Sequence, residues 1–351
     1  MKLLIVTQVM DRSHPILGFF HRWVEEFAKH CDQVHVICLE AGDHNLPYNV
    51  VVHSLGKEKK AENCLVYIWR YLSLVWKLRK KYDSVFTHMN PEYTIVGYPI
   101  WFVTRKQIGM WYAHGAVSLR LKIATLMSKN VFTSTPQGFR LNIPKRKIVG
   151  QGIDTILFTP ADTETHSEEL QLVTVGRMTP AKNIDTLLRS CAVLKGTGQP
   201  FSFSIVGGAV TDQEKVYERQ MMDLTHELGL DDEVVFVGSV KQSKLPEVLR
   251  RSDLFIHDGQ TGSLDKVLLE VMASATFVIS SNESYKALME NAEYNTVYTT
   301  GDFETLANMV QEFLMLPKEK KENVINANRQ LVKTDHSLVT FVQKIVSEYT
   351  M

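Results

Sequence analysis

The chain has 351 residues, of which 44% are hydrophobic and 22% charged, and its formal net charge at pH 7 is zero. These are ordinary values for a globular protein, and the length predicts about two domains, each large enough to bury its own core. The longest weakly polar run, residues 94–104, is well short of the ~20 residues that span a bilayer, and the start MKLLIVTQVMD lacks the cleavage site of a secretory signal. We therefore expect a soluble or peripheral protein.

Short β-branched runs alternate with stretches of helical period along the first half. Strands are predicted at residues 2–8, 33–38, 49–55, 84–89, 108–114, 130–135 and 147–151. Helices fill the gaps between them, for example residues 19–30 and 64–82. Apolar strands separated by amphipathic helices indicate parallel βαβ units with both faces of the sheet covered.

The second half repeats this scheme. Its predicted strands, each followed by a helix, are residues 170–176, 201–208, 233–240, 253–258, 277–281 and 295–300. The last helices are predicted at residues 302–316, 318–333 and 337–350. The polar segment 158–170, which contains Pro160, is predicted to be the linker.

We therefore predict an α/β protein with two facing, Rossmann-like, doubly wound parallel-sheet domains. The N-terminal, acceptor-side domain is expected at residues 1–157 and the C-terminal, donor-binding domain at residues 158–336. We expect the helix at residues 337–351 to pack back on the N-terminal domain. Ligands of open parallel sheets bind beyond the carboxyl ends of the strands, so function is expected in those loops and in a cleft between the domains.

The charges are divided unevenly between the halves. Residues 1–150 contain 21 Lys and Arg but only 10 Asp and Glu, a net charge of +11, and the remainder carries −11. No acidic residue lies between Tyr93 and Ile153. This division suggests that the first half meets an anionic membrane surface or a phosphate-bearing acceptor. The alternative is that the two halves attract each other.

The cysteines indicate a reducing compartment. The four of them, Cys31, Cys38, Cys64 and Cys191, lie far apart without metal-ligand spacing. Cys38 and Cys191 lie in apolar periodic runs and are predicted to be small buried hydrophobes. We expect no structural zinc and a cytoplasmic location, including peripheral association with the cytoplasmic face of the membrane.

The predicted helix at residues 64–82 is amphipathic, aromatic and basic. Its aromatic residues include Tyr67, Trp69, Tyr71 and Trp76, and its basic residues are Arg70, Lys77, Arg79, Lys80 and Lys81. Such a helix can lie on an anionic bilayer, where each basic residue adds ~1 kcal/mol near the surface. The alternative, which we favour at this point, is an ordinary sheet-covering helix whose basic end is solvated.

The sequence VGRMTPAKNIDTLL follows the predicted strand at residues 170–176. Arg177 lies at the carboxyl end of the strand, and Lys182 lies five residues later at the start of the next helix. An Arg fork and a Lys point charge beside a helix amino terminus make a strong site for a diphosphate, and Gly176 lets the backbone approach a ligand. The alternative is that both cations are solvated surface charges.

The segment TGSLDKVLLEVMASATFVIS, residues 261–280, begins with a polar helix entrance. Gly262 permits close approach of the backbone, and Ser263 is the predicted N-cap. Asp265 would then lie in the first turn, where the helix dipole favours a carboxylate, and Lys266 follows it. A packing helix requires neither of these charges.

Glu270 lies further along the same predicted helix, between two apolar residues. A buried carboxylate must find hydrogen-bond donors, because burying it unpaired is costly. We expect the hydroxyls of a ligand to provide them.

Four segments in this order and spacing carry a family resemblance: VGQGIDTILFTP, LVTVGRMTPAKNIDTLL, VVFVGSVKQSKLPEVLRRSDLFI and residues 261–280. Together they resemble the retaining glycosyltransferases of family four, which have the GT-B fold. The resemblance covers residues 130–350 and, more loosely, the first domain. It implies a hexosyltransferase-type enzyme of polysaccharide biosynthesis that uses a UDP- or GDP-linked sugar and needs no metal or other cofactor. The implied acceptor is a hydroxyl of a glycan or of a lipid-linked molecule.

The resemblance also implies roles for single residues of the second domain. Arg177 and Lys182 match the pair that neutralises the diphosphate of the donor. Glu270 matches the second Glu of the family's E-x7-E signature, which holds the ribose hydroxyls. The loop from Gly238 to Val240 matches the segment beside the base.

Two positions of the first domain match the family as well. Gly18 matches, loosely, a glycine-bearing loop that faces the donor phosphate. His114, in WYAHG, matches a histidine beside the transferred sugar, although a lone histidine is usually a structural one. A GxGxxG motif after the first strand is missing, which argues against an NAD enzyme.

The sequence departs from the family at the first Glu of E-x7-E. Gly262 stands there, and Ser263-Leu264-Asp265 replaces the usual Gly-Phe-Gly. The resemblance therefore leaves the sugar contacts to backbone amides of residues 262–265 and to the Asp265 carboxylate. Two other functions stay open, a non-catalytic nucleotide-sugar-binding protein or partner subunit of the same fold and a nucleotide-sugar epimerase. No nucleic-acid partner is expected.

Overall fold

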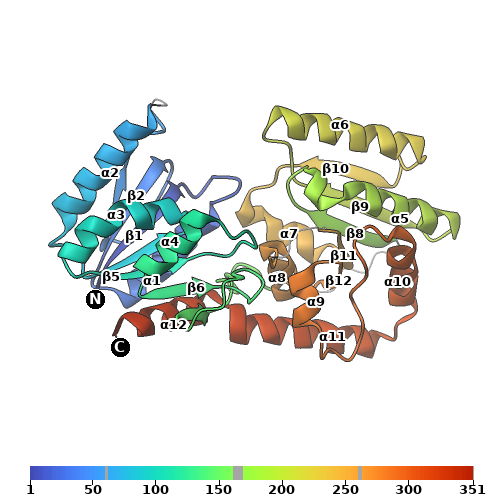
Figure 1. Ribbon diagram of the computed structural model, residues 1–351. Coiled ribbons are helices and arrows are strands. Elements are labelled where there is room, and N and C mark those ends of the chain that lie inside the picture. The colour runs from blue at the N-terminus through green and yellow to red at the C-terminus, as the bar shows by residue number, and fades with distance from the viewer. Residues whose placement is uncertain (60–61, 161–168, 260–262, 351) are drawn as a thin grey trace. The chain divides into compact units, whose positions relative to one another are not determined.

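The computed structural model describes residues 1–59, 62–160, 169–259 and 263–350 (Figure 1). The chain forms two compact units. The first consists of Met1–Gly152 together with Asp335–Met351, and the second of Ile153–Thr334. Each is an α/β unit built on a parallel sheet, which confirms the predicted fold class.

The sheet of the first unit has seven strands in the order β3-β2-β1-β4-β5-β6-β7, and every neighbouring pair is parallel. The strands are β1 (Lys2–Met10), β2 (Gln33–Ala41), β3 (Val50–Ser54), β4 (Ser84–His88), β5 (Gln107–Trp111), β6 (Asn130–Thr133) and β7 (Arg146–Ile148). The chain order reverses between β1 and β4. This is the switch point of a doubly wound sheet.

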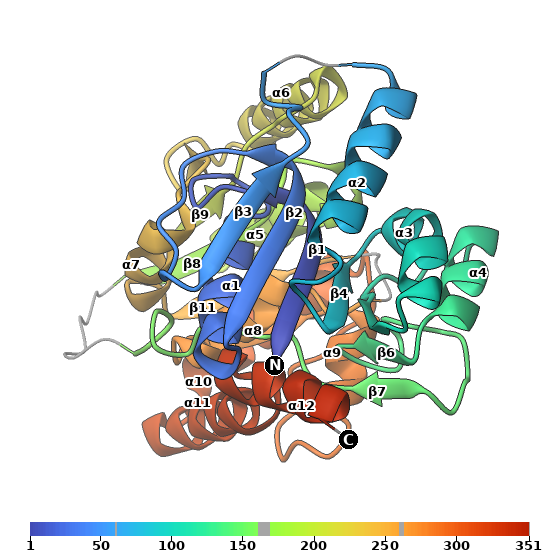
Figure 2. The ribbon, with the colours of Figure 1, turned by 90° about the vertical axis from the view of Figure 1, so that its left-hand side faces the viewer.

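Alternation along β1 sends neighbouring side chains to two separate cores. Leu3 and Ile5 pack with α1 (Phe19–His30) and α12 (Leu338–Thr350), whereas Leu4 and Val6 pack with α2 (Cys64–Leu78) and α3 (Pro91–Val103). Successive strand residues point to opposite faces, so each face needs its own helices. Helix α4 (Leu119–Met127) lies beside α3 (Figure 2).

The C-terminal helix α12 is part of the first unit. Tyr349 donates a hydrogen bond of 2.7 Å from its hydroxyl to the carbonyl of Val85 in β4, and Glu348 forms an ion pair of 2.9 Å with Lys147. Gly109 in β5 leaves room for the tyrosine, because a Cβ there would lie 2.2 Å from the Tyr349 hydroxyl oxygen.

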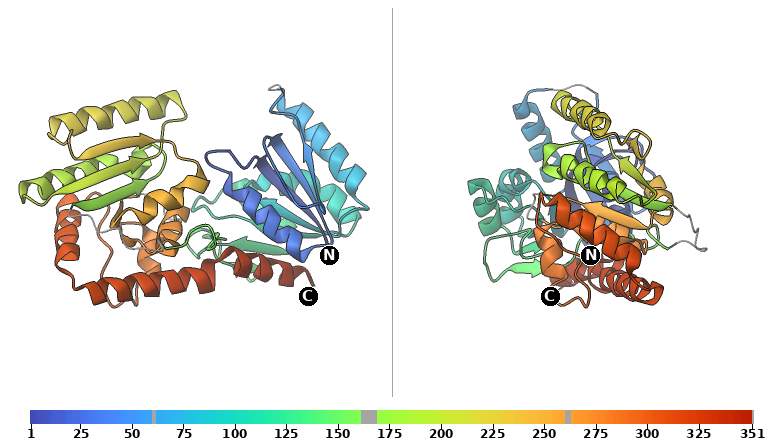
Figure 3. Two further views of the ribbon diagram at one scale, coloured as in Figure 1. Left: turned by 180° about the vertical axis from the view of Figure 1, so that it is seen from behind. Right: turned by 90° about the vertical axis from the view of Figure 1, so that its right-hand side faces the viewer.

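The sheet of the second unit has five parallel strands in the order β10-β9-β8-β11-β12. Figure 3 gives two further views of the ribbon. The strands are β8 (Leu170–Val175), β9 (Phe201–Val206), β10 (Val234–Gly238), β11 (Leu254–His257) and β12 (Phe277–Ser280). The chain order reverses between β8 and β11, which places a second switch point there.

Helices cover both faces of this sheet. One face packs on α5 (Ile184–Gly196), α6 (Asp212–Glu227) and α10 (Phe303–Met315). The other packs on α7 (Leu245–Arg250), α8 (Lys266–Ala273) and α9 (Glu283–Leu288), and α11 (Lys318–Leu331) contributes its last residue to this core. The alternation is again visible on the strands, since Leu172 belongs to the first core and Val173 to the second.

Several elements differ from the sequence expectation. The predicted strand at residues 295–300 is reduced to one bridge between Ser280 and Val297, and the Tyr298 hydroxyl in this segment donates a hydrogen bond of 3.1 Å to the His257 carbonyl. Helix α2 ends at Leu78 instead of residue 82. The predicted linker begins inside a core, since Phe158 is 1% exposed and belongs to the second unit, and residues 161–168 lie outside the described residues.

We predict that Gly109→Ala destabilises the first unit by about 1–3 kcal/mol, because the new methyl group overpacks the contact with Tyr349 and Phe132. All five tryptophans lie in the first unit, so urea unfolding followed by tryptophan fluorescence measures this unit alone. Gly115→Ala, whose Cβ meets its nearest neighbour at 3.4 Å, is the control. An unchanged urea midpoint for Gly109→Ala contradicts the packing described for α12.

Candidate functional site

The candidate site lies at the carboxyl ends of β8 and β11, where the order of the second sheet reverses. Gly176 and Arg177 follow β8, and Asp258 and Gly259 follow β11. The two strands are paired in parallel, so the loops after them leave the sheet at the same edge. Ligands of doubly wound sheets bind outside such an edge.

Arg177 is anchored to the amino end of α6. Its Nη1 lies 3.1 Å from Oε1 of Glu214, and the Arg177 side chain is 55% exposed. The other carboxylate oxygen of Glu214 accepts the backbone N–H groups of Val210 and Thr211 at 2.7 and 3.1 Å. These backbone bonds, together with the Arg177 charge, lower the pKa of Glu214 in spite of its burial. Arg177 is therefore oriented by a capping carboxylate and keeps donors facing solvent.

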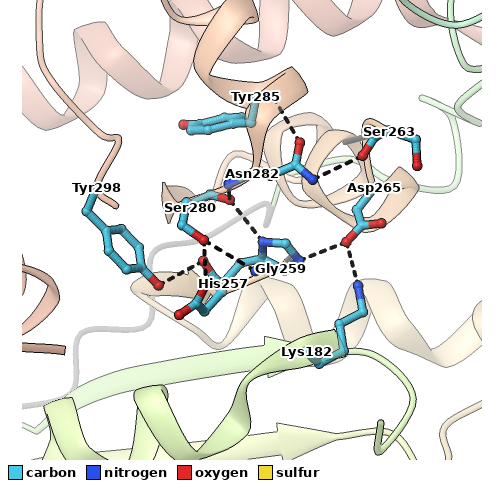
Figure 4. A network of polar contacts seen from close by, with 11 residues as sticks. Lys182, His257, Gly259, Ser263, Asp265, Ser280, Asn282, Tyr285 and Tyr298 are labelled. Atoms are coloured by element: carbon cyan, nitrogen blue, oxygen red, sulfur yellow. Dashed lines mark hydrogen bonds and ion pairs between the residues drawn. The ribbon is translucent and has the colours of Figure 1, made fainter. Parts of the chain in front are cut away.

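Lys182 is paired with Asp265 across the switch point. It ends a short 3₁₀ helix, η1 (Pro180–Lys182), and its Nζ lies 2.5 Å from Oδ2 of Asp265 (Figure 4). Both side chains are about one-fifth exposed, at 20% and 19%. Gly176 makes room for the lysine stem, because a Cβ there would lie 3.2 Å from Lys182 Cε.

The predicted cap of α8 was wrong. Asp265, and not Ser263, is the N-cap residue, and its carboxylate makes no capping hydrogen bond. It bonds instead to Lys182 and to Nε2 of His257, the latter at 2.9 Å. Burial by itself would raise the pKa of Asp265, but the His257 hydrogen bond and the Lys182 charge lower it well below its usual range. The carboxylate therefore bonds to Lys182 and His257 and not to the first backbone N–H groups of α8.

The other residues of this entrance are placed by packing and by Asn282. Leu264 is 3% exposed and belongs to the core under α8. The Ser263 carbonyl accepts a hydrogen bond of 3.0 Å from the Asn282 side chain. Gly262, the predicted site of backbone approach, lies outside the described residues.

Glu270 is buried in α8, as the sequence predicted, at 6% exposure. Its donor comes partly from the protein itself, since Gln242 Nε2 lies 3.2 Å from Glu270 Oε1. Lys266 stands one turn earlier on the same helix. Burial lowers the pKa of Lys266 and raises that of Glu270, and each charge opposes the shift of the other. The sequence expectation that a ligand alone provides the donors was therefore too simple.

The loop after β10 contributes Gly238 and Val240. Gly238 has a φ of +75°, in the left-handed region that favours glycine, and its carbonyl accepts a hydrogen bond of 2.9 Å from the backbone N–H of Gly207. Val240 packs on the core under α8. This ties the loop expected to border the base to the turn after β9.

The two predicted residues of the first unit lie in loops that follow strands. Gly18 immediately precedes α1 in a tight turn, where a Cβ would lie 2.7 Å from the His14 carbonyl oxygen. His114 follows β5 and is exposed. Its Nδ1 accepts a hydrogen bond of 3.1 Å from the Ala116 backbone, so His114 is neither buried nor part of a core.

The sequence interpretation missed His257, the last residue of β11. It is 1% exposed and contacts both Asp265 and Ser280. The signal was present in DLFIHD, where a histidine ends an otherwise apolar buried strand. Nothing local to that strand identified its partner eight residues later.

No three His, Cys, Asp or Glu side chains within the described residues are grouped to hold a metal. No described helix is long and apolar enough to cross a membrane.

A groove of about 690 Å³ runs between η1, α5 and α6, but Arg177, Lys182 and Glu270 do not line it, so it is separate from the charged site.

Residues 158–331, which contain this site, match the family described as glycosyl transferases group 1. The chain belongs to this family of glycosyltransferases. The match covers the second unit almost entirely, together with the residues of that unit that are expected to bind the donor.

A curated relative of this group 1 chain is the putative colanic acid biosynthesis glycosyltransferase WcaL of Salmonella typhimurium. It is 24% identical over 216 residues, which are 59% of this chain and 52% of WcaL. The chain thus spans about half the length of the first curated relatives it matches.

Solved structures resemble the whole chain. HepE (Alr3699) of Anabaena, in complex with UDP, has a TM-score of 0.80 at 17% identity and covers 100% of both chains. Sucrose-phosphate synthase of Thermosynechococcus elongatus has a TM-score of 0.79 at 17% identity, covering 100% of this chain and 98% of its own. At these identities the likeness shows the fold, which is GT-B.

We predict that Asp265→Asn lowers the stability of the second unit by about 1–3 kcal/mol at neutral pH, because it removes the charge that Lys182 and His257 face. Since the folded-state pKa of Asp265 is depressed, this contribution is present above about pH 4 and is lost as the pH falls through the folded pKa. The difference from the unchanged protein should therefore shrink in acid.

The measurement is urea unfolding followed by far-UV circular dichroism. The tryptophan signal identifies the transition of the first unit, so that the other transition is assigned to the second. Asp212→Asn, which changes a carboxylate that is 97% exposed, is the control. A loss of stability that is equally large in acid would show that the Asp265 charge is not its source.

Proposed function

We propose that this protein is a retaining glycosyltransferase that moves a sugar from a nucleotide-diphosphate-sugar to a hydroxyl of a glycan or lipid-linked acceptor. The observation that carries the proposal is the meeting of Lys182 and Asp265 at the switch point of the unit that matches the group 1 family. Arg177 leaves the same strand edge. HepE, which shares the fold, binds UDP, and this supports a nucleotide-linked donor.

In this proposal the two cations act on the leaving group. The donor diphosphate gains negative charge as the bond to the sugar breaks, and Arg177 and Lys182 stabilise that charge in place. Fixed positive charge aimed at developing negative charge is usually the largest catalytic contribution. The acceptor hydroxyl attacks from the face that the diphosphate leaves, and the departing phosphate takes its proton. No pair of carboxylates like that of a glycosidase is then required.

The remaining predicted residues bind the donor. Glu270 is proposed to hold the ribose hydroxyls, with Gln242 keeping its carboxylate in position. Gly238 and Val240 are proposed to border the base, and His114 and Gly18 to lie near the sugar and the phosphate from the first unit. Either UDP or GDP fits this scheme.

A binding protein or an epimerase could use the same donor site. The missing acid at position 262 favours the first, because that position provides sugar contacts in the resembling family. Incubation with UDP- and GDP-sugars and candidate acceptors separates the three functions. Transfer releases the nucleoside diphosphate, an epimerase converts the sugar without an acceptor, and a binding protein does neither.

We predict that Arg177→Ala and Lys182→Ala each lower the turnover number by about a hundred- to a thousandfold, equivalent to ~3–4 kcal/mol, with folding intact. The cause is the loss of one aligned positive group at the diphosphate. The measurement is release of UDP or GDP from the donor that the protein accepts. Arg219→Ala, on the exposed side of α6, is the control, and normal turnover in both site variants would remove this site from the mechanism.

The outer surface of the first unit supports an acceptor at an anionic membrane. Helix α2 buries Tyr71, Val75 and Leu78, and its other side carries three exposed apolar residues, Leu65 (70%), Trp69 (70%) and Trp76 (48%). Their spacing of four and seven residues puts them in one stripe. Sheet-covering helices rarely need such a stripe, so its exposure favours the membrane interpretation over the one preferred from the sequence.

Neighbouring helices extend the same surface. Helix α3 lies beside α2 and α4 beside α3 (Figure 2). They expose Phe102, Val103, Leu119 and Leu126 at 68–80%. Exposed basic residues lie among them, including Lys80, Lys81, Arg120 and Lys122. Apolar residues that enter the headgroup layer and cations that meet its phosphates are the two components of a peripheral membrane site.

We predict that the protein binds vesicles of phosphatidylglycerol and phosphatidylcholine and that the double change Trp69→Ser and Trp76→Ser weakens this binding. Each substitution removes an exposed indole ring that would enter the headgroup layer of the membrane. Binding should fall with added salt, because part of it is electrostatic. Sedimentation with the vesicles measures it, with Met315→Ser, an 86% exposed residue of the second unit, as control. Equal binding to purely neutral vesicles would contradict the basic surface.

A further inference from the structure

His257 is a buried histidine whose ring is held at both nitrogens. Its Nδ1 lies 2.9 Å from Ser280 Oγ and its Nε2 lies 2.9 Å from Asp265 Oδ2 (Figure 4). His257 and Ser280 are partners in the register of β11 and β12. The sheet itself therefore places the imidazole beside the hydroxyl and fixes the direction in which Nε2 points.

The carboxylate of Asp265 assigns the proton of the imidazole. An ionised carboxylate only accepts hydrogen bonds, so we assign a ring proton to Nε2, which donates it to Asp265 Oδ2. In the neutral ring Nδ1 is then the acceptor, and the Ser280 hydroxyl donates to it while Ser280 Oγ accepts a bond of 3.1 Å from the backbone N–H of Asn282. The sequence of donors runs in one direction, from Asn282 through Ser280 and His257 to the carboxylate.

Asp265 Oδ2 receives both this N–H and the ammonium of Lys182, at 2.9 and 2.5 Å. Asp265 Oδ2 thus connects the imidazole of His257, which β11 holds in place, with the flexible side chain of Lys182, which follows β8. Charge-assisted bonds of this kind are roughly twice as strong as neutral ones. The position of the lysine ammonium therefore depends on a ring that the sheet holds in place.

Two glycines leave space for this arrangement. A Cβ at Gly259 would lie 2.7 Å from Cε1 of His257 and 3.1 Å from its Nε2, and a Cβ at Gly176 would lie 3.2 Å from Lys182 Cε. Larger residues at either position would push on the imidazole or on the lysine stem. The loops after β8 and β11 are thus both fitted to the same chain of contacts.

We propose that His257 is a positioning residue, which acts through Asp265 to hold the Lys182 ammonium where the diphosphate of the donor binds. This inference rests on the proposed function. A lysine side chain loses rotamer freedom when it binds an anion, and one that is already held loses less on binding. His257 therefore increases the affinity for the diphosphate without touching it.

The alternative is that His257 only stabilises the fold. Two substitutions separate these roles because each keeps a different half of the ring's contacts. In His257→Gln the amide nitrogen reaches the place of Nε2 and can still donate to Asp265. In His257→Asn the amide reaches only the place of Nδ1 and can still bond Ser280. Neither variant changes the charge of Lys182 or Asp265.

The experiment measures the dissociation constants of UDP and of GDP by isothermal titration calorimetry on the full chain and both variants, with thermal unfolding of each protein in parallel. We expect His257→Gln to stay within about twofold of the unchanged protein and His257→Asn to bind about tenfold more weakly. Both variants lose one buried hydrogen bond, so their melting temperatures should fall by similar amounts. Equal nucleotide affinities in the two variants would overturn the proposal.

A second pair of measurements tests the route through Asp265. In an Asp265→Ala background, His257→Asn should have no further effect on nucleotide affinity, because the connection is already broken. A further loss of about tenfold would show that His257 acts by another route and would overturn the proposal. If the unchanged protein binds neither nucleotide, the proposed function itself fails, and this outcome is distinct from equal affinities in the variants.

Discussion

The parallel pairing of β8 with β11 is the constraint on which the candidate site depends. Strands β9 and β10 lie on one side of β8, and the next strand along the chain, β11, pairs with the other side of β8. Residues more than eighty positions apart, Lys182 and Asp265, can therefore come within 2.5 Å of each other. A lysine and an aspartate on one loop could form the same pair, but they would not be held by two separate strands.

Two ion pairs explain why the charges of this site are compatible with a stable unit. Under the proposed function Arg177 and Lys182 both act on a diphosphate, and cations grouped at a partly buried site repel each other. Here each has a carboxylate of its own, Glu214 for Arg177 and Asp265 for Lys182. Both carboxylates are in turn held by further donors, so the positive groups are oriented before any ligand arrives. This order is what electrostatic catalysis requires.

The sequence was sufficient for the fold class, and the functional roles of the site residues stay predictions. Periodicity placed helix α1 at residues 19–30 because its apolar face repeats cleanly, and strand alternation with helices predicted parallel sheets. It could not place Asp265 correctly, because the choice between capping α8 and pairing with Lys182 is decided by a residue 83 positions away. His257 was missed because nothing in its own strand identified Asp265 as its partner. Residues 295–300 have strand propensity, but in the structure they form only one bridge, between Ser280 and Val297.

The family's acid at position 262 is replaced by Gly262 in this chain, and the contacts of Asp265 with Lys182 and His257 bear on this difference. The resembling family places an acid there and glycines after it, whereas this chain places its acid at Asp265 and fastens it to two partners. A carboxylate anchored by Lys182 and His257 cannot swing freely toward a ligand. Under the proposed function, the carboxylate of Asp265 is therefore presented to the donor sugar as a rigid group.

The first unit is built from two separate segments of the chain, and this affects the order in which the protein folds during its synthesis on the ribosome. The second unit is continuous from Ile153 to Thr334, whereas the first needs α12, which is made only after the second is complete. Until then, the apolar residues of α1 and β1 that pack on α12 have no cover. Nascent chains that stall before residue 338 should consequently present Trp23 and its neighbours to chaperones, while the second unit has already closed around its own core.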